Sequence, residues 1–334
     1  MAKQQVADVY ELTLGGPWVV SASTDPRSVG FAAPLNSLYM RSGTAEWYQK
    51  VDTLDTAWIP WGSSLSVDGV GYYGNGSDGA LVVAGTTTIT RDSWYTTIVV
   101  QNGGRLNTNG YRVMATTSIT VDVGGVVAYD GNNAVTFNAG ASGNSGGTLP
   151  FGLVGGVGNT GAGSSANNND YLITGSGSGG NGGLGPSGAG GAGGVLTGAA
   201  ATTGRWRNLP QFVWASLLSS GSATVVDASC GGGGGGGDGV NRGGGGGGGG
   251  GTIVLAAPVI ANNGAIRAPG GNGANGIAGN AGGGGGGGGG HVFLLAPIFT
   301  GSNPAVTGGT QGSGVGTGVN GVAGSPGSFF RLPV

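Results

Sequence analysis

A nine-glycine run followed at once by an apolar stretch decides the fold of this chain; it reads GGGGGGGGG-TIVLAAPVI at residues 243–260. The same pattern returns 39 positions further on, where GGGGGGGGG-HVFLLAPIF occupies residues 282–299. Each copy predicts a glycine run, an apolar strand and a turn, and the equal spacing predicts that the copies stack. His291 takes the position of Thr252 in this repeat, so we interpret it as a structural residue.

The glycine runs need a structure that does not depend on side chains. A run of nine glycines has nothing to bury, so packing cannot hold it as an ordinary helix or strand. It is either a flexible linker or part of a polyglycine II helix bundle, with three residues per turn and backbone groups bonded to neighbouring helices. Glycine occupies every third position within residues 179–194, 270–282 and 318–327. This phase favours the bundle, with pure runs inside and mixed series outside.

A second repeat precedes the glycine-rich part. The sequence IVVQNGGRL at residues 98–106 aligns with ITVDVGGVV at residues 119–127, an offset of 21 positions. A strand and a glycine turn in each copy predict a short stack of β-rungs. Nearer the N-terminus, alternation at residues 37–41 and 47–51 predicts short antiparallel strands.

Together these patterns predict an all-β fold in three parts. They are a small N-terminal β attachment domain at residues 1–65, a solenoid-like, β-helix-like region of β-rungs at 66–142, and a polyglycine II bundle with interleaved strands at 143–334. A non-glycine insertion at residues 202–229 interrupts the last part. Within this insertion, residues 209–219 are the one stretch that could form a helix.

Composition excludes several classes of protein. The 334 residues include 84 glycines, only 8% are charged, and the net charge is −2 without a basic stripe, so we expect no nucleic-acid partner. No apolar run approaches the ~18 residues of a membrane-spanning helix, so no membrane insertion is expected. The first twenty residues carry no visible signal peptide. Cys230 and His291 are the single residues of their kinds, so we expect neither a metal site nor a cofactor.

Two aromatic clusters are candidate contact sites. The first combines tryptophan and tyrosine with charged residues, a mixture that suits a protein interface or the domain's own core; its members are Trp47, Tyr48, Trp58 and Trp61. The second lies in the insertion and could contact a receptor or partner, or pack internally; its members are Arg205, Trp206, Arg207, Phe212 and Trp214. Asp92, Asp122 and Asp130 are the carboxylates available for a hydrolase site, and we expect none of them to be catalytic.

Several segments resemble a known class of virion protein. Residues 38–43, 47–51 and 55–58 are similar to small β-domains of phage tail-fibre and head-fibre proteins. Residues 86–92 and 106–113 resemble rung elements that precede glycine-rich regions in such proteins. The glycine runs resemble the polyglycine II sandwich of tail-fibre tip adhesins. The resemblance is therefore to glycine-rich fibre and spike proteins of tailed bacteriophages.

This resemblance implies a non-enzymatic structural protein on the virion surface, assembled in the host cytoplasm, that takes part in host attachment. Its expected partners are copies of itself, as a homo-oligomer and most simply a trimer, other virion proteins at the N-terminal domain, and a host-surface glycan or outer-membrane protein. Three alternatives remain open: a dedicated receptor-binding tip adhesin, a polysaccharide-degrading tailspike, and a bacterial surface protein.

Overall fold

The computed structural model divides the chain into two units, which cover residues 1–72 and residues 73–333. The residues that the structure describes are 8–11, 18–34, 37–41, 46–50, 53–56, 58–60, 73–140, 147, 149, 152–166, 169–170, 179–194, 196–197 and 231–332. The predicted insertion at 202–229 lies outside them.

The first unit is a five-stranded sheet with one short helix. Its elements are β1 (Asp8–Glu11), β2 (Trp18–Ala22), α1 (Pro26–Val29), β3 (Leu38–Arg41), β4 (Glu46–Lys50) and β5 (Trp58–Pro60). The strands pair in sequence order, antiparallel except for β2 with β3. The two stretches of predicted alternation become β3 and β4, and the strands share a core of Val20, Tyr39, Tyr48 and Trp58.

The second unit contains a solenoid, which is built from two sheets of parallel strands. The eight-stranded sheet consists of β6 (Ala80–Val83), β8 (Ser93–Val100), β10 (Arg112–Val121), β14 (Thr252–Ala256), β15 (Val259–Asn262), β17 (His291–Leu295), β18 (Ile298–Gly301) and β19 (Ser328–Leu332). The four-stranded sheet consists of β7 (Thr86–Thr88), β9 (Arg105–Asn107), β11 (Val126–Ala128) and β16 (Ala265–Arg267). A separate pair joins β12 (Asn169–Asp170) to β13 (Leu196–Thr197).

Both sequence repeats are strand registers of this solenoid. Ile98 lies opposite Ile119, which is the offset of 21. Thr252 lies opposite His291, which is the offset of 39. Inward-facing aliphatic residues from successive turns therefore stack into one core, in which Ile98, Ile119, Ile260 and Leu294 are fully buried.

One long strand connects the two repeats. Along one edge β10 pairs with β8. Along its other edge the first half pairs with β14 and the second half with β15. The apolar strands that follow the glycine runs are therefore further turns of the same solenoid that begins at residue 80.

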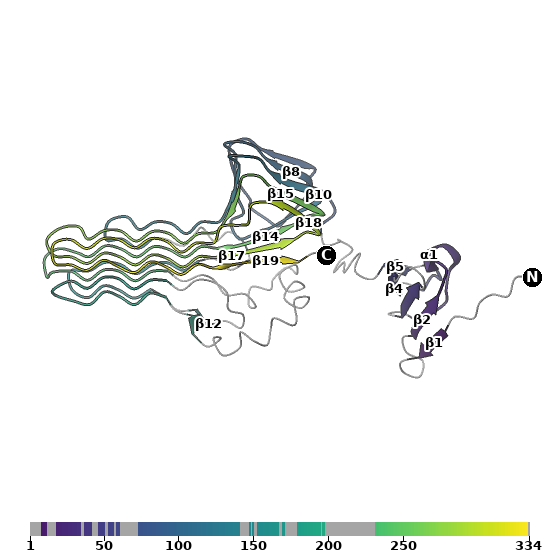
Figure 1. The fold of residues 1–334 in the computed structure, drawn as a ribbon, viewed down its shortest axis with the longest axis horizontal. Coiled ribbons are helices and arrows are strands. Elements are labelled where there is room, and N and C mark those ends of the chain that lie inside the picture. Colours follow the sequence, from purple (N-terminus) through teal and green to yellow (C-terminus); the bar gives the residue numbers. More distant parts are fainter. Residues whose placement is uncertain are drawn as a thin grey trace, which may run out of the picture. The chain divides into compact units, whose positions relative to one another are not determined.

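The glycine-rich segments all leave the solenoid at one corner, between the four-stranded sheet and the next strand of the eight-stranded sheet. The chain departs after β11 and returns at β14, departs after β16 and returns at β17, and departs after Ala305 and returns at β19. We call these segments, residues 131–140, 152–166, 179–194, 231–251, 269–290 and 306–327, the glycine layer. In Figure 1 they run side by side away from the strands.

Hydrogen bonds between segments hold the glycine layer together. Along the run at 282–290, whose residues are all buried, consecutive N–H groups donate to three different neighbouring segments in turn. The bonds run from Gly285 to Gly233, from Gly286 to Val322 and from Gly287 to Gly271, at 2.8, 2.9 and 2.8 Å. A direction that repeats every three residues explains why glycine recurs at every third position in the outer segments.

The predicted fold class is wrong. The described part of the glycine layer belongs to neither helix nor strand, so the unit is not all-β, and the polyglycine II helix bundle is not confirmed. Its strands belong instead to two parallel sheets shared with residues 80–128. The physical reason is that glycine runs lack side chains that would select a regular element, and their backbone groups are satisfied by other segments instead. Contacts group residues 73–333 in one compact unit.

Candidate binding groove

The predicted contact residues of the first unit have mixed outcomes. Tyr48 and Trp58 are 1% and 3% exposed, so they are core residues and do not form an attachment surface. Trp58 donates its indole N–H to the carbonyls of Asp55 and Phe31, at 2.9 and 3.1 Å. Trp47 lies in β4, but its side chain is outside the description. Trp61 and the whole second cluster, Arg205, Trp206, Arg207, Phe212 and Trp214, also lie outside the described residues.

A polar groove lies instead on the outer face of the four-stranded sheet, beside the glycine layer, with a volume of about 640 Å³. Thr88, Asn107, Ala128 and Arg267 occupy the same position on four consecutive strands. Alternation sends Leu106 and its equivalents inward and leaves these residues on the outer face. Ala128 lies between Asn107 and Arg267 in this row and is fully buried, so its neighbours cover it.

An arginine–aspartate–arginine cluster closes one side of the groove. Asp130 follows β11, whose neighbours β9 and β16 carry Arg105 and Arg267. Its Oδ2 accepts hydrogen bonds from Arg105 at 3.0 Å and from Arg267 at 2.9 Å. Arg105 also donates its Nε–H to Asn107 Oδ1 at 2.7 Å. Two guanidinium groups and one carboxylate give the groove an excess of one positive charge, in a chain whose net charge is −2.

The cluster is incompletely hydrogen-bonded. Within the described residues, Oδ1 of Asp130 and Nε of Arg267 are buried and have no hydrogen-bond partner. A buried polar group without a partner costs ~1–3 kcal/mol. Unpartnered buried polar atoms call for an explanation, and a functional site is one place where they are expected.

Asparagine and threonine side chains of the glycine layer form the opposite wall. Asn133 Oδ1 accepts the N–H of Asn272 at 2.8 Å, and Asn272 Oδ1 accepts the N–H of Thr310 at 2.9 Å. These bonds link the first residues of three glycine-layer segments, those that begin at residues 131, 269 and 306. The wall therefore has fixed side chains, with Asn132 and Thr307 among its further lining residues.

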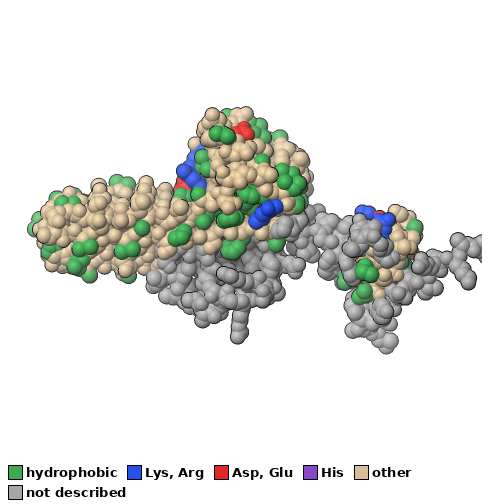
Figure 2. Space-filling model, in the orientation of Figure 1, with side chains coloured by type: hydrophobic (Ala, Val, Ile, Leu, Met, Phe, Trp, Pro, Cys, Tyr) green, Lys and Arg blue, Asp and Glu red, His purple; other side chains and the backbone are tan. Residues whose placement is uncertain are grey.

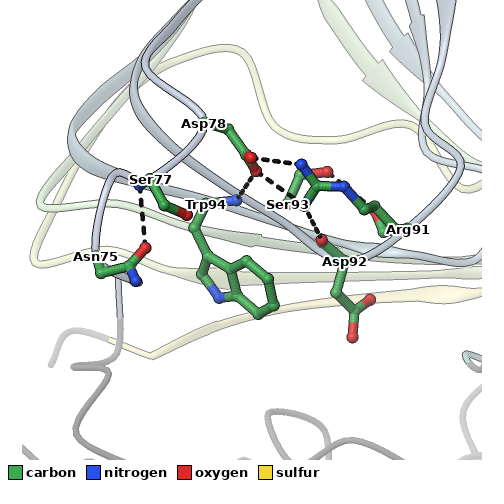
Figure 3. Close-up of polar contacts among 7 residues, drawn as sticks. All are labelled: Asn75, Ser77, Asp78, Arg91, Asp92, Ser93 and Trp94. Carbon is green, nitrogen blue, oxygen red and sulfur yellow. Dashed lines mark hydrogen bonds and ion pairs between the residues drawn. The ribbon is translucent and has the colours of Figure 1, made fainter.

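A second polar cluster lies near the start of the solenoid, where β8 begins (Figure 3). Asp78 pairs with Arg91 and accepts the N–H of Trp94 at 2.8 Å. The hydrogen bond from Arg91 lowers the pKa of Asp78. Both carboxylate oxygens of Asp78 accept hydrogen bonds from Arg91, and Arg91 also donates to the carbonyl of Asp92, so we assign the pair a structural role.

The three carboxylates considered for hydrolysis are not brought together. Asp92 pairs with Arg112, whose side chain is 1% exposed, at 3.0 Å. Asp122 follows the far end of β10, so the eight-residue strand β8 separates the level of Asp92 from that of Asp122 by ~26 Å. Asp130 is held by its two arginines.

His291 occupies the structural position expected from the repeat. It is 2% exposed, and its ring centroid lies 5.7 Å from that of Phe293 and 6.3 Å from that of Phe330. Among the described residues, no three His, Cys, Asp or Glu side chains are grouped so as to hold a metal ion. No helix in the described ranges has the length and apolar character needed to cross a membrane.

No protein-family model, curated protein or solved structure matches this chain. Function is therefore inferred from its own residues and geometry. The sequence did not predict the groove, because Asp130 and Arg267 are 137 positions apart in the chain. The one available signal was the offset of 21, which places Asn107 opposite Ala128, two residues before Asp130.

Proposed function

We propose that the chain is a non-enzymatic structural protein on the surface of a tailed-phage virion, as a fibre, spike or decoration protein that takes part in host attachment. The observation that carries this proposal is the glycine layer, whose buried backbone groups are bonded from segment to segment. Such a layer leaves few unsatisfied backbone groups and suits a stiff body exposed to the environment.

The far ends of the segments are also tied together. Asp238 Oδ2 accepts the N–H of Asn280 at 2.9 Å, and Asn280 Oδ1 accepts the N–H of Thr317 at 2.9 Å. Gly239 donates to the carbonyl of Thr160 at 2.8 Å. Four loops from distant parts of the sequence are thus fixed at one end of the layer, which is the arrangement required to display loops on a rigid support.

A receptor-binding tip adhesin is the second candidate. Val240 lies in one of these loops and is 82% exposed. A single exposed apolar side chain is normal on a protein surface, so the support for this candidate is the set of four loops fixed at one end of the layer. The insertion at 202–229, which could contact a receptor or partner or pack internally, lies outside the described residues.

A homotrimer remains our proposal for the assembly. Val319 donates its N–H to the carbonyl of Leu184 at 2.8 Å, and Val322, three residues further along, donates to the same neighbouring segment. These three side chains are 52%, 54% and 55% exposed, so two adjacent segments present apolar groups to the outside. Sedimentation equilibrium of the full-length chain should give three times 31.8 kDa, and a folded monomer would contradict this assembly.

The location is tested on phage particles produced from the genome that encodes the chain, with a tag at its C-terminus. Gold-labelled antibody against the tag should decorate purified particles at a constant place on their surface. Absence of the chain from purified particles would refute the proposal, and labelling only after the particles are opened would show an internal protein.

A further inference from the structure

We propose that the groove between the four-stranded sheet and the glycine layer binds an acidic saccharide, with Arg105 and Arg267 holding its carboxylate. The groove lies where the glycine layer meets the solenoid, and basic and acidic side chains gather there in Figure 2. This inference concerns the groove alone and does not depend on a virion location.

The charge of the groove selects the ligand's anionic group. Asp130 neutralises one of the two guanidinium groups and leaves the second in excess. Each guanidinium carries five N–H donors. Arg105 uses two of its nitrogens and Arg267 uses one in the hydrogen bonds of the described residues. The two side chains are 30% and 40% exposed, so their terminal N–H groups, unlike the buried Nε of Arg267, can reach a carboxylate, which guanidinium binds in a two-pronged geometry.

The remaining lining selects hydroxyl groups. The wall is lined by the hydroxyl groups of Thr307 and Thr310 and by further amide side chains. Ligand sites for apolar molecules are lined mainly by hydrophobic and aromatic side chains, which this groove lacks apart from Tyr129, Ala128 and Pro269. A saccharide supplies hydroxyl groups that both donate and accept, so it can pair with amides of either orientation.

The walls are already in place before a ligand arrives. Asp130 fixes both guanidinium groups from opposite sides, and the bonds from Asn133 to Asn272 and on to Thr310 fix the opposite wall. A pre-formed site loses less conformational entropy on binding.

Titration calorimetry on the full-length chain tests the proposal with a hyaluronan tetrasaccharide as the acidic probe, and with neutral tetra-N-acetylchitotetraose and inorganic phosphate for comparison. We expect the acidic tetrasaccharide to bind at least 10-fold more tightly than the other two. If the neutral tetrasaccharide bound as tightly as the acidic one, the arginines would not recognise a carboxylate. If phosphate bound as tightly as the acidic tetrasaccharide, the groove would bind anions without recognising a saccharide. Absence of binding to the acidic probe would overturn the proposal.

Three variants locate the binding. Arg267→Gln should weaken it at least 10-fold, and Thr307→Tyr should block the groove without touching the charged cluster. Arg91→Gln is the matched control, because it removes the same charge from an Arg–Asp pair outside the groove and should leave the affinity unchanged. Thermal unfolding of each variant shows that it is folded. Unchanged binding in both groove variants, or equal loss in the control, would overturn the proposal.

Discussion

The glycine layer makes a sharp prediction at Gly285, in the middle of a buried run. The Cβ of an alanine at this position would lie 1.9 Å from the carbonyl oxygen of Gly180 and 2.6 Å from its carbonyl carbon. Both atoms belong to the backbone of a neighbouring segment, so no side-chain rotation can relieve the contact. Gly285 also donates to Gly233 and accepts from Gly247, at 2.8 and 2.9 Å, so movement of the run would strain bonds on two other sides.

The cost of Gly285→Ala follows from these contacts. Overpacking of a tight interior costs ~1–3 kcal/mol. Loss of one buried backbone hydrogen bond, with a group left unsatisfied, adds ~1–3 kcal/mol. The reduced entropy of the unfolded alanine chain returns only ~0.4–1 kcal/mol. The net loss of about 1–5.6 kcal/mol is a large share of the ~5–15 kcal/mol that stabilises a typical protein.

Scanning calorimetry of the full-length chain provides the measurement. A domain of this size loses ~2–4 °C of Tm per kcal/mol, so Gly285→Ala should lower the transition of the second unit by roughly 2–22 °C. Gly85→Ala is the matched control, because its Cβ would meet nothing within 4 Å and its φ is not positive. If the two variants shifted Tm equally, close backbone packing would not be the reason for glycine in the runs.

Two further predictions concern the edge and the end of the layer. Gly276→Val should lower Tm and impair assembly, because its Cβ would lie 2.4 Å from the carbonyl oxygen of Ala281. Asn275→Ser should cost only ~1 kcal/mol, because Asn275 Oδ1 accepts a single hydrogen bond, from the N–H of Ser313. Equal losses of Tm in calorimetry would contradict this difference. Hydrogen bonds from the N–H groups of Asn241 and Asn280 lower the pKa of Asp238, so its stabilising charge is present above the ordinary carboxyl pKa and is lost only as pH falls through the lowered value. Hydrogen exchange of the loops should thus be protected equally at pH 5 and 8 and lose protection only in strong acid; in Asp238→Asn this acid-dependent loss should disappear.

The sequence predicts local repeats well because a strand register is a difference in residue number. Ile98 and Ile119 occupy equivalent positions in two copies of one pattern, and so do Thr252 and His291. The sequence does not show that β10 pairs with β14, because the two strands lie far apart in the chain and belong to different repeats. For this reason the solenoid and the glycine-rich part looked like separate regions.

The candidate sites show a related limit. Tyr48 and Trp58 have the composition of an interface, yet core and interface both use aromatic residues, and only burial separates the two roles. Asp130 lies in a sequence typical of a turn, and its role depends on Arg267. Arg267 belongs to β16, whose residues pair with residues of β11 that lie 139 positions earlier in the chain. Charge pairing between distant turns of a solenoid has no local pattern from which it could be predicted.

The solenoid also explains how segments without side chains find their partners. Strands of a sheet lie ~4.8 Å apart in the direction of their hydrogen bonds. Because successive excursions leave from the same corner, their first residues start at this spacing and continue the ladder of the four-stranded sheet. Ala268 donates to Ala305, Gly131 to Pro269, and Gly270 to Thr307, each at 2.9 Å. The apolar core thus sets the register at one end of each segment, and glycine allows the rest of the segment to keep that close spacing. The stability of the glycine layer is therefore coupled to a core that contains hardly any of its residues.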